Sequence, residues 1–225
     1  MITQSQYHGV FIEKKGFKSL LYTKNLLPGK KVYDEKLVFD KGVEYREWNP
    51  KKSKIGAALL KNINKSPLKE GDCVLYLGCS SGTTASHISD IIGENGFLFG
   101  IDFAYRMMRD FTFLCQERRN MAPILGDCKK PETYEKRIFL CDIMIQDIAQ
   151  KDQLGIFLQN LRFLKKGGFG FLVIKARSID VIRNPKQIFG EIERELEKHV
   201  KIIDFRNLEP FEMDHCIFLI EKDRM

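Results

Sequence analysis

The feature that most constrains this chain is the alternation of short apolar runs with longer amphipathic stretches after Gly71. The apolar runs are residues 73–77, 97–101, 138–145 and 169–174, and the stretches with helical spacing are 83–92, 104–118, 152–164 and 185–200. Almost uninterrupted apolar runs are typical of parallel strands that helices cover on both faces. The alternation predicts an α/β fold with a Rossmann-like, doubly wound sheet and ligand sites at the carboxyl ends of its strands. Residues 201–205 and 215–221 are expected to form a final strand pair.

The first 50 residues follow another pattern. Short alternating runs at 9–12, 19–22 and 36–39 are separated by turns at Gly16, Pro28-Gly29 and Lys41-Gly42, which predicts a small antiparallel sheet. Asn49-Pro50 is typical of a helix start, and apolar residues then recur at helical spacing as far as Ile63. We therefore expect a small N-terminal β domain over residues 1–50 and a larger α/β domain over residues 51–225.

Positive charge is concentrated in the N-terminal third. The formal net charge is +7, and residues 1–70 hold 15 lysine and arginine residues against 7 acidic ones. The remaining chain is near neutral, with 22 basic residues against 23 acidic ones. A one-sided basic segment indicates a polyanionic partner, although a solvated lysine-rich surface would have the same composition.

Several classes are disfavoured by composition. No apolar run approaches the ~18 residues that a membrane span requires, and the polar start of the chain has no signal-peptide pattern. The six cysteines are scattered without a CxxC pair, so neither a zinc site nor a disulfide framework is indicated. We expect no metal, no membrane partner and a location in the cytoplasm or nucleus.

A glycine-rich turn follows the first apolar run, from Leu77 to Thr84, with glycines at 78 and 82. Such a turn lets backbone approach a ligand closely and exposes helix N–H groups. A nucleotide-binding P-loop ends in GK[ST], and Gly82-Thr83-Thr84 lacks the lysine; a dinucleotide fold prefers GxGxxG. The turn of methyltransferases fits better, although its usual leading acid is replaced by Tyr76 or Leu77.

Polar residues follow each of the other strands. Asp102 comes about 20 residues after the turn, where an acid suits a ribose diol. Asp127 could accept a hydrogen bond from an adenine amino group, and residues 147–150 lie where the reactive end of a cofactor is expected. Any one of these acids could be a helix cap or a turn residue, and it is their joint placement at strand ends that indicates a cofactor site.

These motifs resemble fibrillarin, the methyltransferase of box C/D guide ribonucleoproteins, over nearly the whole chain. The ordered matches are Gly9-Val10-Phe11, Thr23-Lys24-Asn25-Leu26, Tyr45-Arg46-Glu47-Trp48-Asn49-Pro50, Val74-Leu75-Tyr76-Leu77-Gly78, Ser81-Gly82-Thr83-Thr84, Ser86-His87-Ile88-Ser89-Asp90 and Leu208-Glu209-Pro210-Phe211-Glu212-Met213-Asp214-His215. Cys79 stands where the family usually has alanine, Asp102 replaces the common glutamate, and Tyr7-His8 also departs from the usual pattern. The chain lacks the Gly/Arg-rich tail of eukaryotic members and looks like the archaeal type, which implies a cytoplasmic location (nucleolar in a eukaryote).

The resemblance implies a cofactor, S-adenosylmethionine, and a set of residues that contact it. These are Gly78, Thr83, Thr84, Asp102, Phe103, Asp127, Cys128, Asp147, Ile148, Ala149 and Gln150. Phe103 is expected to stack on adenine, unless it is a core aromatic. The resemblance also implies partners: a box C/D guide RNA, a target rRNA or tRNA, a Nop-family scaffold protein and a kink-turn-binding protein. The scaffold is expected to contact the helices over 104–118 or 152–164.

Related ribose methyltransferases use a Lys-Asp-Lys-Glu set, and this chain offers Lys24, Asp147, Lys175 and His215 in the same order. A ribose hydroxyl is a poor nucleophile that needs alignment and help with its proton. We expect Lys175 to contact the 2′-oxygen and Asp147 to position both Lys175 and the cofactor. Lys24 and His215 would hold the substrate or tune Lys175. On residues alone, Lys24 could be an exposed surface lysine and His215 a core histidine.

Three alternatives stay open. The same fold could methylate a small molecule or a protein, including a glutamine side chain. The chain could be an assembly subunit that binds RNA without catalysis, although all four candidate groups are present. A nicotinamide oxidoreductase is disfavoured because GxGxxG is absent.

Overall fold

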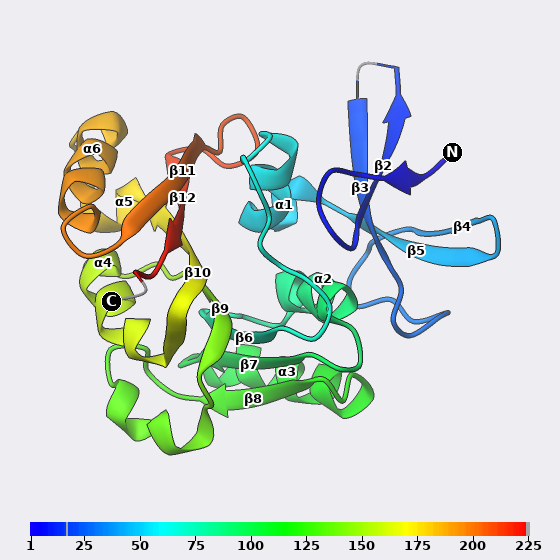
Figure 1. The fold of residues 1–225 in the computed structure, drawn as a ribbon, viewed down its shortest axis with the longest axis horizontal. Coiled ribbons are helices and arrows are strands. Elements are labelled where there is room, and N and C mark those ends of the chain that lie inside the picture. Colours follow the sequence, from blue (N-terminus) through cyan, green and yellow to red (C-terminus); the bar gives the residue numbers. More distant parts are fainter. Residues whose placement is uncertain (17, 224–225) are drawn as a thin grey trace.

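The N-terminal residues form a five-stranded antiparallel sheet (Figure 1) in the computed structural model, which describes residues 1–16 and 18–223. Its strand order is β1 (Thr3–Gln4), β2 (Val10–Lys15), β3 (Lys18–Lys24), β5 (Val43–Trp48) and β4 (Leu37–Asp40). The predicted antiparallel sheet is therefore confirmed. Sequence analysis missed the short β1 and also β5, whose inward position 46 holds a buried arginine in place of an apolar residue.

The second sheet has seven strands in the order β11 (Lys201–Asn207), β12 (His215–Glu221), β10 (Leu164–Lys175), β9 (Cys141–Gln146), β6 (Cys73–Leu77), β7 (Phe97–Asp102) and β8 (Met121–Leu125). The five strands from β10 to β8 are parallel, and β12 runs antiparallel to both β10 and β11. This confirms the predicted Rossmann-like fold. The strand expected from residue 138 begins only at Cys141, because the preceding residues follow two 3-10 turns, η2 (Pro131–Thr133) and η3 (Glu135–Arg137).

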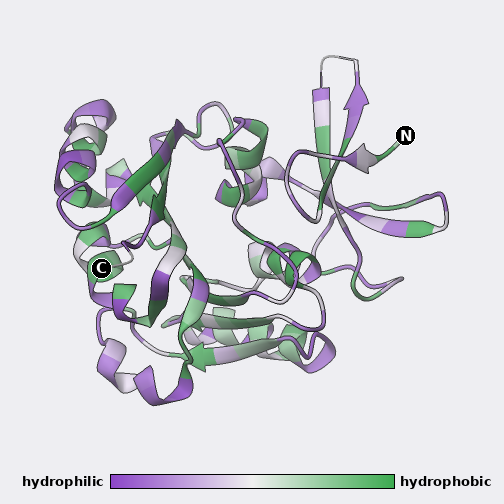
Figure 2. Cartoon of the chain, viewed as in Figure 1, coloured by the Kyte–Doolittle hydropathy of each residue, from purple (hydrophilic) through white to green (hydrophobic). Residues whose placement is uncertain are grey.

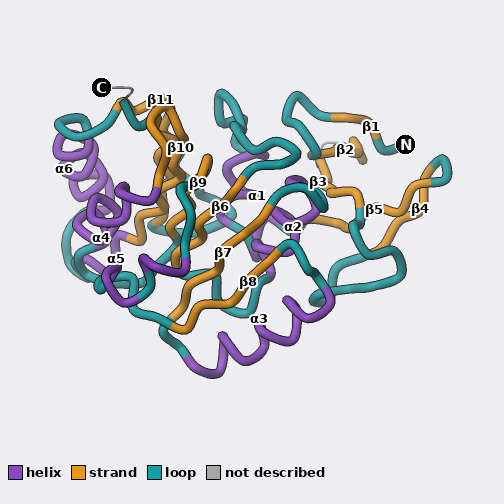
Figure 3. Tube along the Cα trace, turned by 60° about the horizontal axis from the view of Figure 1, so that its bottom comes forward, coloured by secondary structure: helices purple, strands orange, loops and turns teal. Residues whose placement is uncertain are grey.

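Helices cover both faces of this sheet. They are α1 (Lys54–Leu60), α2 (Thr83–Ile92), α3 (Tyr105–Glu117), α4 (Gln153–Asn160), α5 (Ala176–Ile179) and α6 (Pro185–Leu196). Alternate strand residues pack on opposite faces, so Val74 and Tyr76 join a core with α1, α2 and α3, whereas Leu75 and Leu77 join one with α4 and α6. Figure 2 shows hydrophobic residues concentrated along the central strands, and Figure 3 shows α4, α5 and α6 gathered beside β10 and β11.

The helix expected directly after Asn49-Pro50 begins in two steps. Asn49 caps a 3-10 turn, η1 (Pro50–Lys52), and its side chain accepts a hydrogen bond from the Lys51 amide at 3.0 Å. Ser53 then caps α1, with its Oγ accepting from the Gly56 amide at 3.2 Å. The second cap makes Lys54 the first residue of α1 and fixes where its side chain starts.

Buried charges join the two sheets across α2. The Asp90 carboxylate, at the carboxyl end of α2, accepts from Arg46 of β5 at 2.8 Å and from Arg118 at 2.7 Å. Arg46 also pairs with Glu35 at 2.8 Å, and the four side chains are at most 1% exposed. Burying charges is favourable only when they are paired and hydrogen-bonded, so this junction admits one arrangement of sheet and helix.

The expected division at residue 50 falls at the start of η1, and the last two residues of the expected domain 51–225 lie outside the described residues. Among the residues that the structure describes, no helix combines the length and apolarity needed to cross a lipid bilayer.

Candidate functional site

The glycine turn after β6 is held tightly against its neighbours. Gly78 has φ of +79°, and a Cβ at this position would lie 2.3 Å from the Asp147 carbonyl oxygen. The amides of Gly78 and Cys79 both donate to the Ile101 carbonyl, at 2.8 and 3.1 Å. Only glycine tolerates this backbone conformation at such a close approach, so the turn is fixed to the ends of β7 and β9.

The predicted cofactor residues converge on one pocket of about 230 Å³ at the carboxyl ends of β6, β7, β8 and β9. It is lined by Gly78, Ser80, Asp102, Phe103, Ala104, Met107, Asp127, Cys128, Asp147, Ile148, Ala149, Gln150 and Ile156. Every predicted cofactor residue is present except Thr83 and Thr84. Sequence analysis missed Ser80, Ala104 and Met107, which lie next to predicted residues or one helical turn away. It also missed Ile156, which α4 brings in from a distant part of the chain.

Thr83 and Thr84 start α2 beyond the pocket. The Thr84 hydroxyl donates to Ser53 Oγ at 3.0 Å, and the residue is 7% exposed. Thr84 therefore ties α2 to the cap of α1. The glycine turn correctly predicted the N-terminus of a helix. It could not show that α1 would pack against this end of α2.

The strand-end acids are anchored by backbone amides. Asp102 accepts from the Ser80 amide at 3.0 Å through one oxygen and from the Ala104 amide at 2.9 Å through the other. Asp127 uses one oxygen to accept from the Lys129 amide at 3.0 Å. A carboxylate oxygen has more than one lone pair, so both acids keep capacity for a ligand while their orientation is fixed.

Two further side chains shape the pocket wall. The Phe103 side chain is 64% exposed at the pocket rather than packed in the core. Burial raises the pKa of the Cys128 thiol to about 12, so this thiol stays protonated at neutral pH. The Cys128 carbonyl is held by the Asn160 side-chain amide at 2.9 Å.

A lysine, but not the predicted one, reaches Asp147. Lys54 Nζ lies 3.3 Å from Asp147 Oδ2 and 3.9 Å from Glu212 Oε1, with the three side chains 22–25% exposed. The Asp147 amide donates to the Leu77 carbonyl at 3.0 Å, which fixes the loop after β9. Sequence analysis did not single out Lys54, although its place directly after Ser53, a residue type typical of helix caps, could have done so.

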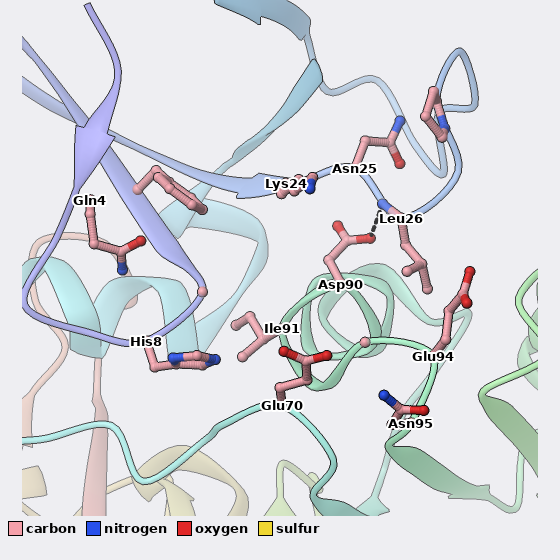
Figure 4. Close-up of a pocket in the computed structure, with 14 residues that line it drawn as sticks. Gln4, His8, Lys24, Asn25, Leu26, Glu70, Asp90, Ile91, Glu94 and Asn95 are labelled. Carbon is pink, nitrogen blue, oxygen red and sulfur yellow. Dashed lines mark hydrogen bonds between the residues drawn. The ribbon is translucent and has the colours of Figure 1, made fainter. Parts of the chain in front are cut away.

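Lys24 lies elsewhere, and the structure does not bring it together with Asp147. Lys24 ends β3 and lines a larger cleft of about 610 Å³ with Glu70, Asp90 and Glu94. Figure 4 shows this cleft beside Asp90 and Ile91, at the carboxyl end of α2, whereas the glycine turn enters the amino end of that helix. Chain order alone could not show which lysine the packing of α1 would bring to Asp147.

Lys175 and His215 are brought together by the pairing of β10 with β12, in which they are directly opposite each other. Leu172 pairs with Gln146 across β10 and β9, so Lys175 lies beyond the level of Asp147 at the same sheet edge. The Gln153 side chain binds the Lys175 backbone on both sides, accepting from its amide at 2.8 Å and donating to its carbonyl at 3.1 Å. These two hydrogen bonds from Gln153 were not predicted.

His215 is oriented by the turn that precedes it. Its Nδ1 lies 2.6 Å from the Met213 carbonyl oxygen, and because a carbonyl only accepts, Nδ1 carries the hydrogen. Asp214 in the same turn pairs with Arg177 at 2.9 Å. His215 is 9% exposed, and its Nε2 lies on the side of the ring away from this hydrogen bond.

Across the described residues, no group of three or more histidine, cysteine, aspartate or glutamate side chains could hold a metal ion. The pocket has Asp102, Asp127 and Asp147 on its wall; Lys54 contacts Asp147, and the Lys175–His215 pair lies at the same edge of the sheet.

Comparison with known proteins decides the family. A family model described as Fibrillarin matches residues 1–224. The chain belongs to the fibrillarin family. Two relatives named "Fibrillarin-like rRNA/tRNA 2'-O-methyltransferase" are similar over most of their length. The one from Thermococcus onnurineus is 47% identical over 95% of this chain and 94% of the relative. The one from Pyrococcus horikoshii is 45% identical over 98% of each.

Solved structures of the fibrillarin family have the same fold as this chain. The Methanococcus jannaschii fibrillarin matches with a TM-score of 0.94 and 41% identity, covering 100% of this chain and 98% of that one. The Aeropyrum pernix fibrillarin, solved with natively bound S-adenosyl-L-methionine, matches with a TM-score of 0.89 and 42% identity over 98% and 97%. A chain from a fibrillarin/Nop5p complex matches with a TM-score of 0.87 and 33% identity over 97% and 100%.

Proposed function

We propose that this chain is an S-adenosylmethionine-dependent methyltransferase that modifies ribose 2′-hydroxyl groups of rRNA or tRNA. The observation that carries the proposal is the convergence of four strand ends on one pocket, with Lys54 and Asp147 in contact at its edge. The names of the two relatives and the cofactor bound to the Aeropyrum pernix fibrillarin support it.

The residues of the pocket fit this cofactor. Asp102 is clamped by two backbone amides and can still accept from the ribose diol. Asp127 has an oxygen left for the adenine amino group, and the exposed Phe103 ring can stack on the base. Residues 147–150 would hold the remaining end. When bound, the cofactor supplies a methyl group attached to a positively charged sulfur.

The chain's own residues would then align the ribose hydroxyl and manage its proton. Lys175 contacts the 2′-oxygen, as the proton acceptor or as its electrostatic partner. His215, opposite Lys175 in the strand pairing, holds the substrate ribose. Asp147 is oriented by Lys54, which replaces Lys24 in the proposed catalytic set of Lys54, Asp147, Lys175 and His215. Alignment of this kind can supply a large part of the rate enhancement.

Specificity would come from partners. Lysine contacts to phosphate orient RNA without reading its sequence, and the basic N-terminal third suits that role. The similarity to a chain solved with Nop5p supports a Nop-family scaffold as one partner. We extend this to a box C/D guide RNA, which would select the target by pairing, and to a kink-turn-binding protein. The relatives are archaeal, which supports a cytoplasmic location.

Two experiments test the proposal in sequence. First, S-adenosylhomocysteine at 100 times its dissociation constant should stabilise the chain by about 2.7 kcal/mol, visible as a rise of several degrees in the unfolding temperature, whereas NAD should not. Second, the chain reconstituted with scaffold, kink-turn protein and guide RNA should place labelled methyl groups on one guided ribose. Label that enters only protein, or full site-selective activity without guide or scaffold, would contradict the proposal.

A further inference from the structure

Two cysteines from neighbouring strands meet at the sheet edge that lies opposite the cofactor pocket. Cys73 is the first residue of β6 and Cys141 the first of β9, and their Sγ atoms are 3.4 Å apart. Parallel pairing of Val74 with Ile143 holds the two strand starts side by side. Cys141 is fully buried, whereas Cys73 is partly exposed. One sulfur is therefore accessible and the other lies directly behind it.

Charged neighbours surround the accessible sulfur. The Cys73 amide donates to Asp142 at 3.0 Å, and Asp142 in turn pairs with Lys165 at 2.7 Å. The pKa of Cys73 is lowered, chiefly because the Cys141 thiol can donate a hydrogen bond to the Cys73 thiolate. Burial and the Asp142 carboxylate oppose this shift, and Lys165 adds a smaller favourable contribution. The pKa of Cys141 is raised by the same contact and by burial.

The other cysteines lack this combination. Burial raises the pKa of each of the remaining thiols, Cys79, Cys115, Cys128 and Cys216. Cys115 is partly exposed like Cys73, but no sulfur contact or charged partner accompanies it among the described residues. Reactive cysteines are accessible to their reaction partners, and Cys73 alone of the six is both partly exposed and in contact with a second thiol.

We propose that Cys73 and Cys141 form a reversible disulfide, a modification site at the amino ends of β6 and β9. The oxidant is a low-molecular-weight disulfide such as glutathione disulfide. The Cys73 thiolate attacks one of its sulfurs, which forms a mixed disulfide and releases one thiol. Cys141 then loses its proton and attacks Cys73 Sγ, which closes the protein disulfide and releases the second thiol. Two protein thiols are oxidised and one small disulfide is reduced to two thiols.

The disulfide would link β6 and β9 covalently at their amino ends, and the carboxyl ends of the same two strands lead into the cofactor site. β6 leads into Gly78 and β9 leads into Asp147. Because the cysteines stand at the strand starts and the pocket at the strand ends, oxidation should leave methyl transfer unchanged. Closing a long loop constrains the unfolded chain, so the oxidised protein should unfold at a temperature several degrees higher than the reduced protein.

Mass spectrometry of the purified chain tests the proposal. After exposure to glutathione disulfide, thiols titrated in denaturant should fall from the six of the sequence to four. Trypsin should then release residues 70–106 joined to residues 138–151, and dithiothreitol should separate them. The first peptide also contains Cys79, so Cys73→Ser must abolish the link, whereas the matched variant Cys115→Ser must keep it.

The opposite results would overturn the proposal. These are six remaining thiols, a lasting mixed disulfide at Cys73 without closure, or the same cross-link in Cys73→Ser. Cys141→Ala provides a second check: it should retain glutathione on Cys73, because the attacking second thiol is gone. Absence of glutathione from a folded Cys141→Ala protein would show that Cys73 is not the accessible nucleophile.

Discussion

Replacing Gly78 by alanine should separate the conformational role of this residue from its close approach to Asp147. The native φ of +79° places the residue in the left-handed region, which costs an L-residue about 1–2 kcal/mol. In addition, the new Cβ would lie 2.3 Å from the Asp147 carbonyl oxygen, well inside van der Waals contact. The loop after β9 must therefore move by roughly 1 Å, a displacement that can cost about 100-fold in rate.

Gly71 offers a matched control. Its φ is +83°, and a Cβ there would meet nothing within 4 Å. Gly71→Ala should therefore lose the same ~1–2 kcal/mol of unfolding free energy without disturbing the pocket. Urea unfolding measures the first effect, and calorimetric titration with S-adenosylhomocysteine together with turnover in the reconstituted particle measures the second.

Gly78→Ala should thus lose at least as much stability as Gly71→Ala, and only Gly78→Ala should lose function. We expect Gly78→Ala to lose about 100-fold in turnover and to bind S-adenosylhomocysteine more weakly. Gly71→Ala should be close to wild type in both quantities. Equal cofactor affinity and turnover in the two variants would refute the reasoning, because it would mean that the contact between the turn and Asp147 has no part in shaping the site.

Three further predictions concern Lys54 and the buried groups between the N-terminal sheet and α2. Lys54→Met should lower turnover about 100-fold or more with little change in folding, whereas the turnover of Lys24→Met should stay within a few-fold of wild type. The reverse order in a methyl-transfer assay would return Lys24 to the proposed catalytic set in place of Lys54. Asp90→Asn leaves two buried guanidinium groups short of a carboxylate and should cost about 3–5 kcal/mol of unfolding free energy, and a loss below ~1 kcal/mol in denaturant titration would contradict the pairing. Burial holds the pKa of His87 well below its ordinary value, so below about pH 6.5 the unfolded chain binds a proton that the folded chain does not, and the free energy of unfolding should fall. His87→Gln should reduce this dependence of stability on pH, and an unchanged dependence would contradict the prediction.

The sequence was sufficient for the fold class and most of the pocket because those features are local. Asp102 ends β7, Asp127 lies two residues after β8 and Asp147 directly follows β9, and parallel strands bring their carboxyl ends to one edge. Residues that depend on packing between distant elements were not predictable in this way. Lys54, Gln153 and Ile156 reach the site through helices whose place on the sheet no local pattern reveals.

The missed strand β5 has a different cause. Arg46 stands at an inward position of that strand, where alternation would call for an apolar side chain, and it is buried by its ion pairs with Glu35 and Asp90. A period-two reading counts such a residue as solvent-facing. The alternation pattern fails at Arg46 because its ion-pair partners lie outside the strand and meet it only in the folded chain.

The same buried charges restrict how the enzyme can meet its substrate. A bend between the N-terminal sheet and α2 would pull Arg46 of β5 from the Asp90 carboxylate, which would keep its contact with Arg118, and would leave a buried guanidinium short of one partner. A change in the angle between the basic sheet and the α/β part of the chain should therefore cost stability. Under the proposed function, we expect adjustment to different guide RNAs to come mainly from the RNA or the scaffold protein.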